Sequence, residues 1–274
     1  MIIPIFSWPD LCYWSKRDAI DYYAENGFAL FDKVMSKEGC LEIEYTYRLK
    51  ADDDFAPILN LDRREPFIRE VVMKNPVVTA IIERLTGSEM VGCQTFFLFK
   101  EPGTRYANQQ WNPHQDNSYP RAEPGAYLAV DIALEDQEPN GGILTLWPGT
   151  HKLGLLPFEE KTGYREKEGE RPGNKVIMPD KIILEESVRP NPDVERCDDL
   201  YEFLKDAEVS FESIPMVNIA LKQGQALVFD GNLIHSSGPN TSGKGRPAII
   251  TNYLKKGAEM IEGRTAQRMR IALR

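Results

Sequence analysis

The chain is poor in the residues that define several function classes. It has three histidines and four cysteines among 274 residues, and the cysteines, at positions 12, 40, 93 and 197, form no Cys-x-x-Cys pair. Without that spacing we expect reduced, mostly buried thiols and no thiolate metal site. The sequence also lacks an apolar run of membrane-spanning length, and its first residues lack the basic and apolar segments of a signal peptide. These absences predict a cytoplasmic protein with no membrane contact.

Positive charge is also scarce. The 33 Lys and Arg are outnumbered by 42 Asp and Glu, which gives a formal net charge of -9. A nucleic-acid-binding protein would present a basic face, so no nucleic-acid partner is expected. The 42% of hydrophobic residues is ordinary for a globular protein, and no internal repeat interrupts the chain. We therefore predict one domain over residues 1–274.

Helical patterns come first in the chain and strand patterns follow. Residues 15–50 are expected to be helical, with Ser15 and Ser36 as caps, and a third helix is expected from about Pro66 to Leu85. After residue 90 the apolar residues alternate or form short runs between Gly, Pro and Asn, which predicts strands. The expected strands are 93–99, 127–134, 143–147, 226–229 and 248–253. This order predicts a mainly β sandwich or barrel with flanking helices.

The expected domain has a helical part at about 10–88 and a β core at about 90–255. The core is interrupted at about 152–215 by a stretch rich in Glu, Lys, Pro and Gly. Insertions of this length inside a domain are usually lids or binding loops, or else merely mobile. We interpret this insertion as a lid, because it lies between the segments that contain His114 and His235 and both of its flanks lead toward them.

Two of the three histidines occur in a pattern suited to a metal. His114 and Asp116 form a His-x-Asp pair, and His235 follows an apolar run that reads as a strand. Residues two apart on a strand point to the same face, so His114 and Asp116 can chelate one ion. Two imidazoles and one carboxylate are the set that holds non-haem Fe(II) and leaves three coordination positions open. The pattern predicts an iron oxygenase.

Arg246 follows His235 by eleven positions and begins another apolar run. An arginine pointing into a barrel from this strand would be a fixed fork for a carboxylate. With Asn140-Gly141-Gly142 and Pro148-Gly149-Thr150-His151-Lys152 between the two halves, the ordered motifs resemble the phytanoyl-CoA dioxygenase family of Fe(II)/2-oxoglutarate oxygenases over roughly residues 20–255.

The resemblance implies a fold and a set of ligands. The fold would be a double-stranded β-helix, a jelly roll of the cupin kind, with His114, Asp116 and His235 as iron ligands. Fe(II), the co-substrate 2-oxoglutarate and O2 would be required, with Arg246 and Ser237 on the distal carboxylate of 2-oxoglutarate. Apart from the resemblance, Gln94 on an early strand is a candidate to hydrogen-bond the carboxylates of 2-oxoglutarate, and the alternative is a glutamine that is simply solvated.

Asp131 is a further candidate site residue. In Tyr127–Leu134 strict alternation places the larger apolar residues on one face and Tyr127, Ala129, Asp131 and Ala133 on the other. A buried carboxylate needs a partner. The sequence leaves three partners open, which are a substrate amine, Arg105 and Arg121.

Two other polar residues have structural interpretations. His151 is expected to satisfy backbone groups of a turn and not to bind metal. Asp230 is expected in a turn, or as a carboxylate that orients the imidazole of His235.

The expected function is hydroxylation, or desaturation, of a small-molecule metabolite with release of succinate and CO2. Asp116 is retained where related halogenases lack a carboxylate, so halogenation is disfavoured. An acyl-CoA substrate is an alternative, but the basic residues at 161–175 alternate with glutamates and read as a solvated loop. A cupin-type metal enzyme, which usually carries His-x-His, and a binding module that does not use 2-oxoglutarate are further alternatives.

Overall fold

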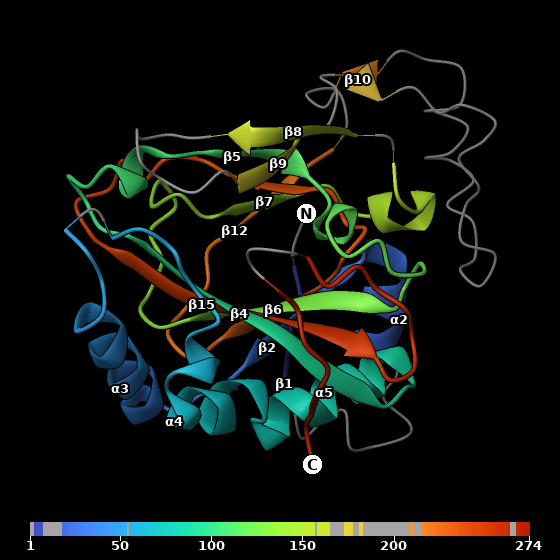
Figure 1. Cartoon of the computed structure of the whole chain (residues 1–274), viewed down its shortest axis with the longest axis horizontal. Coiled ribbons are helices and arrows are strands. Elements are labelled where there is room, and N and C mark those ends of the chain that lie inside the picture. The colour runs from blue at the N-terminus through green and yellow to red at the C-terminus, as the bar shows by residue number, and fades with distance from the viewer. Residues whose placement is uncertain are drawn as a thin grey trace.

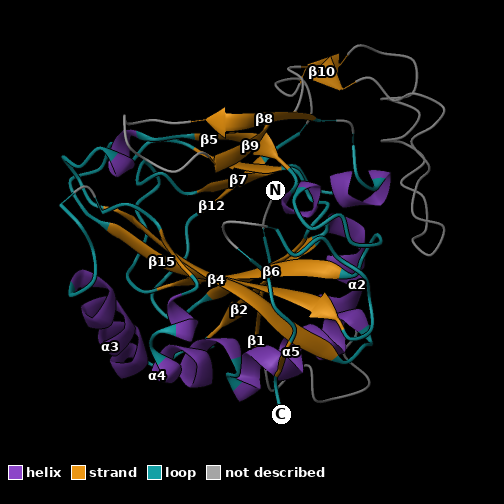
Figure 2. Cartoon of the chain, in the orientation of Figure 1, coloured by secondary structure: helices purple, strands orange, loops and turns teal. Residues whose placement is uncertain are grey.

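A computed structural model of the chain describes residues 3–7, 18–53, 55–156, 158–164, 173–177, 181–182, 209–210, 215–263 and 267–274. The described chain forms three layers, in which helices cover one face of a large sheet and a smaller sheet covers the other (Figure 1; Figure 2). This architecture, with helices beside a cupin-like double-stranded β-helix, confirms the predicted fold class.

The large sheet has eight strands in the order β1-β2-β13-β6-β15-β4-β16, with β3 paired to β4. Most of its neighbours are antiparallel, and β1 and β2 are parallel. The strands are β1 Ile5–Ser7, β2 Phe28–Asp32, β3 Ile58–Leu59, β4 Met90–Lys100, β6 Tyr127–Ala133, β13 Ala226–Asp230, β15 Arg246–Lys255 and β16 Ile271–Ala272.

Both faces of the large sheet are buried, and β6 shows how the sequence divides them. Leu128, Val130 and Ile132 pack toward the helices, whereas Ala129 and Ala133 pack toward the small sheet. The predicted alternation of this strand is confirmed. Burial of a Leu, Ile or Val side chain contributes about 1.5–3 kcal/mol, so the register is strongly specified.

The helices are α2 Asp18–Asn26, α3 Lys37–Arg48, α4 Pro66–Ile68 and α5 Pro76–Thr86, with a π turn over Arg69–Met73. The predicted cap of α3 is confirmed, because the Ser36 hydroxyl accepts a hydrogen bond from the Gly39 amide. The expected cap at Ser15 lies outside the described residues.

Two of the expected helical segments are wrong in detail. The segment expected as one helix from Pro66 to Leu85 is broken before Pro76, which cannot donate a backbone hydrogen bond, and Asn75 caps a new start by accepting from two amides of α5. Residues 15–50 are not all helical, since Phe28–Asp32 forms β2 in the large sheet. A segment of five residues between two helical patterns is too short for its hydrophobic periodicity to distinguish a strand from a helix.

The small sheet has four strands in the order β12-β7-β14-β5. Its strands are β5 Trp111–His114, β7 Leu144–Leu146, β12 Val217–Ile219 and β14 His235–Ser237. Leu144, Leu146 and Ile219 pack against Phe229 and other residues of the large sheet, which holds the two sheets face to face.

Two strand pairs are described within the expected insertion, and the rest of residues 152–215 lies mostly outside the described part. The pairs are β8 Glu159–Tyr164 with β9 Gly173–Ile177, and β10 Lys181–Ile182 with β11 Val209–Ser210. β9 lies beside β5 (Figure 1). The lid interpretation stays a prediction. Among the described helices, none has the length and apolar character of a membrane span.

Candidate metal centre

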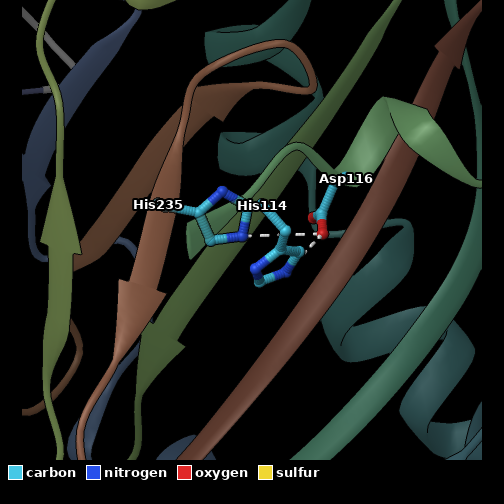
Figure 3. Close-up of side chains that lie close together, drawn as sticks. All are labelled: His114, Asp116 and His235. Carbon is cyan, nitrogen blue, oxygen red and sulfur yellow. Dashed lines mark ion pairs between the residues drawn. The ribbon is translucent and has the colours of Figure 1, made fainter. Parts of the chain in front are cut away.

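The side chains of His114, Asp116 and His235 converge between the two sheets (Figure 3). Their ligand atoms all lie within 4.8 Å of one another. Nε2 of His114 is 3.6 Å and Nε2 of His235 is 3.5 Å from Oδ1 of Asp116. Both histidines are buried. The three residues that the sequence singled out are therefore brought together, although 119 positions separate Asp116 from His235.

The small sheet positions both imidazoles by the same local device. His235 on β14 is the cross-strand partner of His114 on β5. In each ring Nδ1 lies close to the carbonyl oxygen two residues earlier, 2.8 Å from Asn112 and 3.0 Å from Leu233. A carbonyl only accepts, so Nδ1 carries the proton and the lone pair of Nε2 points toward Asp116.

Asp116 reaches the centre in a different way from the one expected. The strand β5 ends at His114, and Asp116 is the first residue of a 3-10 turn over Asp116–Ser118. The expectation that both chelating residues share one extended strand is wrong, because the chain turns directly after Gln115. The side-chain amide of Gln115 fixes this turn, because its Nε2 donates hydrogen bonds to the carbonyl oxygens of Gly154 and Asn232, at 2.8 and 2.6 Å.

The electrostatics of the centre favour an ionised carboxylate. Burial acts to raise the pKa of Asp116, but the neighbouring His235 and His114 hold that pKa well below its usual range. Burial conversely acts to lower the pKa of His235, and Asp116 outweighs it and raises this pKa. The carboxylate thus stays negative between two imidazoles, as a divalent cation requires.

The donor set and its spacing fit a non-haem iron ion. Nitrogen and oxygen ligands lie about 2.0–2.2 Å from divalent ions such as zinc, so two ligands at right angles are about 3 Å apart. The observed Nε2 to Oδ1 distances of 3.5 and 3.6 Å need to close by only a few tenths of an ångström. Two histidines and one carboxylate on one side of an ion match the facial triad of Fe(II) oxygenases.

A buried ion pair of Arg246 and Asp131 lies close enough to the triad for Asp131 to contribute to the raised pKa of His235. Nη2 of Arg246 donates to Oδ2 of Asp131 at 3.2 Å, and the two side chains are 2% and 0% exposed. Burial raises the pKa of Asp131, and Arg246 acts in the opposite direction. The other carboxylate oxygen, Oδ1, and Nε of Arg246 have no hydrogen-bond partner in the described chain. The partner of Asp131 is thus neither Arg105 nor Arg121 but the residue expected to bind 2-oxoglutarate.

Lys100 is a buried residue of this region that the sequence interpretation missed. It is the cross-strand neighbour of Arg246 and is 1% exposed. Its amine donates to Oγ of Ser237 at 3.1 Å, to the carbonyl oxygen of Gln109 at 3.2 Å and to that of Gly238. Alternation along β4 places it on the same strand face as Gln94 but does not show that a lysine at the end of the strand is buried.

Gln94 and Asp230 are two further residues singled out from the sequence, and both are buried. Gln94 is buried on β4 opposite Asn252, six residues before Lys100, and its contact with 2-oxoglutarate stays a prediction. Asp230 accepts from the Asn232 amide at 2.7 Å, which fits the expected turn. The alternative, that Asp230 orients the imidazole of His235, is wrong because the carbonyl of Leu233 does so.

His151 has a structural role, as expected, but the backbone group that it satisfies lies in α2 and not in its own turn. Its Nε2 donates to the Ala24 carbonyl oxygen at 3.0 Å, and the ring packs against Gly27, where an added Cβ would lie 2.5 Å from Nδ1. Burial lowers the pKa of His151 from 6.5 to about 4. The imidazole is therefore neutral in the folded protein at pH values where it is protonated in the unfolded chain.

This pKa shift predicts a loss of stability in acid. Between pH 6.5 and pH 4 the unfolded chain binds a proton that the folded chain does not, so the free energy of unfolding falls as the pH falls. Urea denaturation should show the stability advantage of the wild type over His151→Gln shrinking by about 3 kcal/mol between pH 7 and pH 4. Other titrating groups, Asp230 included, are common to both proteins and cancel. Parallel pH profiles would contradict the assignment.

Most of the chain is similar in sequence to known proteins. A sequence profile of the phytanoyl-CoA dioxygenase family matches residues 23–248. A relative named phytanoyl-CoA dioxygenase from Arabidopsis thaliana is 30% identical over 162 residues, which cover 59% of this chain and 44% of that protein. The peroxisomal phytanoyl-CoA dioxygenase of Rattus norvegicus is 22% identical over 85% of this chain and 66% of its own. The chain spans about half the length of the first curated relatives, 44% to 50%.

Solved structures share the fold. The epimerase SnoN, in complex with Fe3+, alpha ketoglutarate and nogalamycin RO, has a TM-score of 0.61 at 18% identity and covers 88% of this chain and 83% of its own. EvdO2 from Micromonospora carbonacea, complexed with 2-oxoglutarate, has a TM-score of 0.60 at 16% identity and covers 92% and 95%.

Proposed function

Because this chain belongs to the phytanoyl-CoA dioxygenase family, we propose that it is a non-haem Fe(II)/2-oxoglutarate-dependent dioxygenase that hydroxylates a small-molecule metabolite. The observation that carries the proposal is the convergence of His114, Asp116 and His235 beside the buried Arg246. With iron, 2-oxoglutarate and O2 bound, such a centre converts 2-oxoglutarate to succinate and CO2 and oxidises a C-H bond.

The residues divide the work by charge and position. His114, Asp116 and His235 would hold the iron on one side and leave three positions for the co-substrate and O2. Ser237 lies two residues after His235 on the same face of β14, about 7 Å along the strand. Lys100 links it to Arg246, because Lys100 donates a hydrogen bond to Ser237 and is the cross-strand partner of Arg246. A diacid chelated at the iron would thus extend its far carboxylate toward Arg246 and Ser237.

The substrate proposed is a free small molecule, and the second candidate is an acyl-CoA thioester. The names of the relatives, which are phytanoyl-CoA dioxygenases, favour the thioester. SnoN instead forms its complex with nogalamycin RO, and this neighbour favours the free small molecule. Desaturation in place of hydroxylation is the alternative reaction at the same centre.

The test is succinate formation from 2-oxoglutarate under air, with Fe(II) and separate panels of free amines, acids and acyl-CoA thioesters. Stimulation by a member of one panel identifies the substrate class, and the mass of its product separates hydroxylation from desaturation. Tight Fe(II) binding without succinate from any panel would instead favour a cupin-type metal enzyme of another kind.

Asp131→Asn should separate the charge of this residue from its shape. If Asp131 contacted only a positively charged or hydroxyl-rich substrate, the substitution would leave co-substrate handling intact and impair only turnover of that substrate, but Asp131 contacts Arg246 directly. Leaving a buried cation without its counter-ion costs on the order of 3 kcal/mol. The variant should therefore have a lower melting temperature than the wild type. Because a bound carboxylate would replace the missing counter-ion, 2-oxoglutarate should raise the melting temperature of the variant by more than that of the wild type. An equal gain in both proteins would contradict this account. Selection of the substrate by Asp131 stays a prediction.

A further inference from the structure

Lys100 is a fully buried cation to which the proposed reaction assigns no part. We propose that Lys100 is a positioning residue of the co-substrate site, which orients the Ser237 hydroxyl and supplies the positive charge that Asp131 withdraws from Arg246. This inference rests on the proposed function, because it concerns the carboxylate that Arg246 and Ser237 would bind.

The hydrogen bonds of Lys100 fix the hydroxyl. An ammonium has three protons, and Lys100 has three acceptors in the carbonyl oxygens of Gln109 and Gly238 and Oγ of Ser237. Since Oγ of Ser237 accepts from Lys100, the proton of the hydroxyl points elsewhere and is available to a carboxylate. Lys100 thereby makes Ser237 a donor toward the co-substrate.

The space for this amine is provided by a glycine. Gly142 has φ +74°, and a Cβ added to it would lie 2.8 Å from Cδ and 3.1 Å from Nζ of Lys100. Most other residues at position 142 would be strained and would displace the amine. The motif Asn140-Gly141-Gly142 thus acquires a physical role, because its second glycine leaves room for the lysine.

The charges of the region point to the same conclusion. Arg246 and Asp131 alone form a neutral pair, so a carboxylate added to them would leave a buried net negative charge, which is costly. With the ammonium of Lys100 the three groups carry one net positive charge, which one carboxylate neutralises. Burial and, secondarily, Arg246 lower the pKa of Lys100 to about 7. Binding of an anion nearby would favour its protonated form.

The experiment measures anaerobic binding of two 2-oxo acids to the Fe(II)-loaded protein, by the charge-transfer absorption of the chelate or by calorimetry. 2-Oxoglutarate has a distal carboxylate, and 2-oxobutyrate chelates in the same way without one. Lys100→Met should weaken 2-oxoglutarate about 10- to 100-fold, the range for a lost hydrogen bond and charge at an ionised group. It should leave 2-oxobutyrate binding unchanged. A purely structural lysine would change both ligands alike or neither.

Three further proteins sharpen the test. Lys152→Met is the matched control, because Lys152 is also buried but pairs with Glu25 at 3.2 Å, and it should bind both acids normally. Asp131→Asn in the Lys100→Met background restores the net charge of the site and should recover part of the lost affinity. Lys100→Gln keeps amide donors for the backbone carbonyls, and it tests the charge alone if Lys100→Met does not fold.

The outcomes separate the two proposals. If the wild type binds 2-oxobutyrate and 2-oxoglutarate equally, or neither, the proposed co-substrate site is wrong. If the wild type prefers 2-oxoglutarate and the Lys100 variants keep that preference, only the role of Lys100 is wrong. A lost preference that Asp131→Asn does not restore would overturn the charge argument and leave the orientation of Ser237 as the role of Lys100.

Discussion

Replacing His235 or His114 by alanine should abolish Fe(II) binding, and succinate formation with it. Each substitution leaves two protein ligands, and the neighbouring Asp116 then keeps only one of the two imidazoles that hold its pKa low. Loss of groups that merely support a metal ligand costs about 10- to 100-fold in affinity, so loss of a ligand itself should exceed about 100-fold. Anaerobic titration with Fe(II) followed by metal analysis measures the effect.

His151→Ala is the matched control, because it removes the third histidine of the chain from a buried position away from the triad. It should retain iron at wild-type affinity, even if it is less stable. Wild-type iron binding by either triad variant would show that the ion is held elsewhere.

The second large effect is expected from Arg246→Lys. Lysine keeps a positive charge for Asp131, so the buried carboxylate is not left without a cation. It loses the planar fork that binds a carboxylate through two parallel hydrogen bonds. The dissociation constant of 2-oxoglutarate should rise about 10- to 100-fold. Iron affinity should not change, because the proposed ligands are His114, Asp116 and His235, and a guanidinium has no lone pair to offer a cation.

Arg48→Lys is the control for this exchange. Arg48 pairs with Glu44 at 2.7 Å and lies over the ring of Phe99 on the helical side of the large sheet. Its variant should bind 2-oxoglutarate normally. An unchanged 2-oxoglutarate dissociation constant in Arg246→Lys would place the carboxylate anchor at another residue, and Lys100 would be the first to test.

The sequence predicted the architecture because its patterns are local. The alternation of Tyr127–Leu134 specifies which residues of β6 face each layer, and the spacing of His114, Asp116 and His235 indicates one metal site. What it missed depends on which strands become neighbours. Asp131 meets Arg246, 115 residues away, only because β6 lies beside β15.

Lys100 was missed for the same reason. Nothing in the run Phe96-Phe97-Leu98-Phe99-Lys100 separates a lysine that ends a strand in solvent from one that points between two sheets. Burial follows from the positions of Ser237 and Gly142, which lie far along the chain. Asp116 shows the opposite limit, since its place beside His114 was foreseen although the backbone between them turns.

The strand order of the small sheet affects the local stability of the metal-free protein. His114 lies on β5, the last strand of its sheet, whereas His235 lies on β14 in the interior. Although β9 lies beside it, β5 is hydrogen-bonded within the described residues to β14 alone, so an ion bound to both histidines would cross-link this strand to the body of the fold. The unfolded chain has no such preformed site, so binding of iron and docking of β5 onto its sheet are thermodynamically linked. Removal of the metal would therefore first loosen β5, the strand that carries the ligand His114.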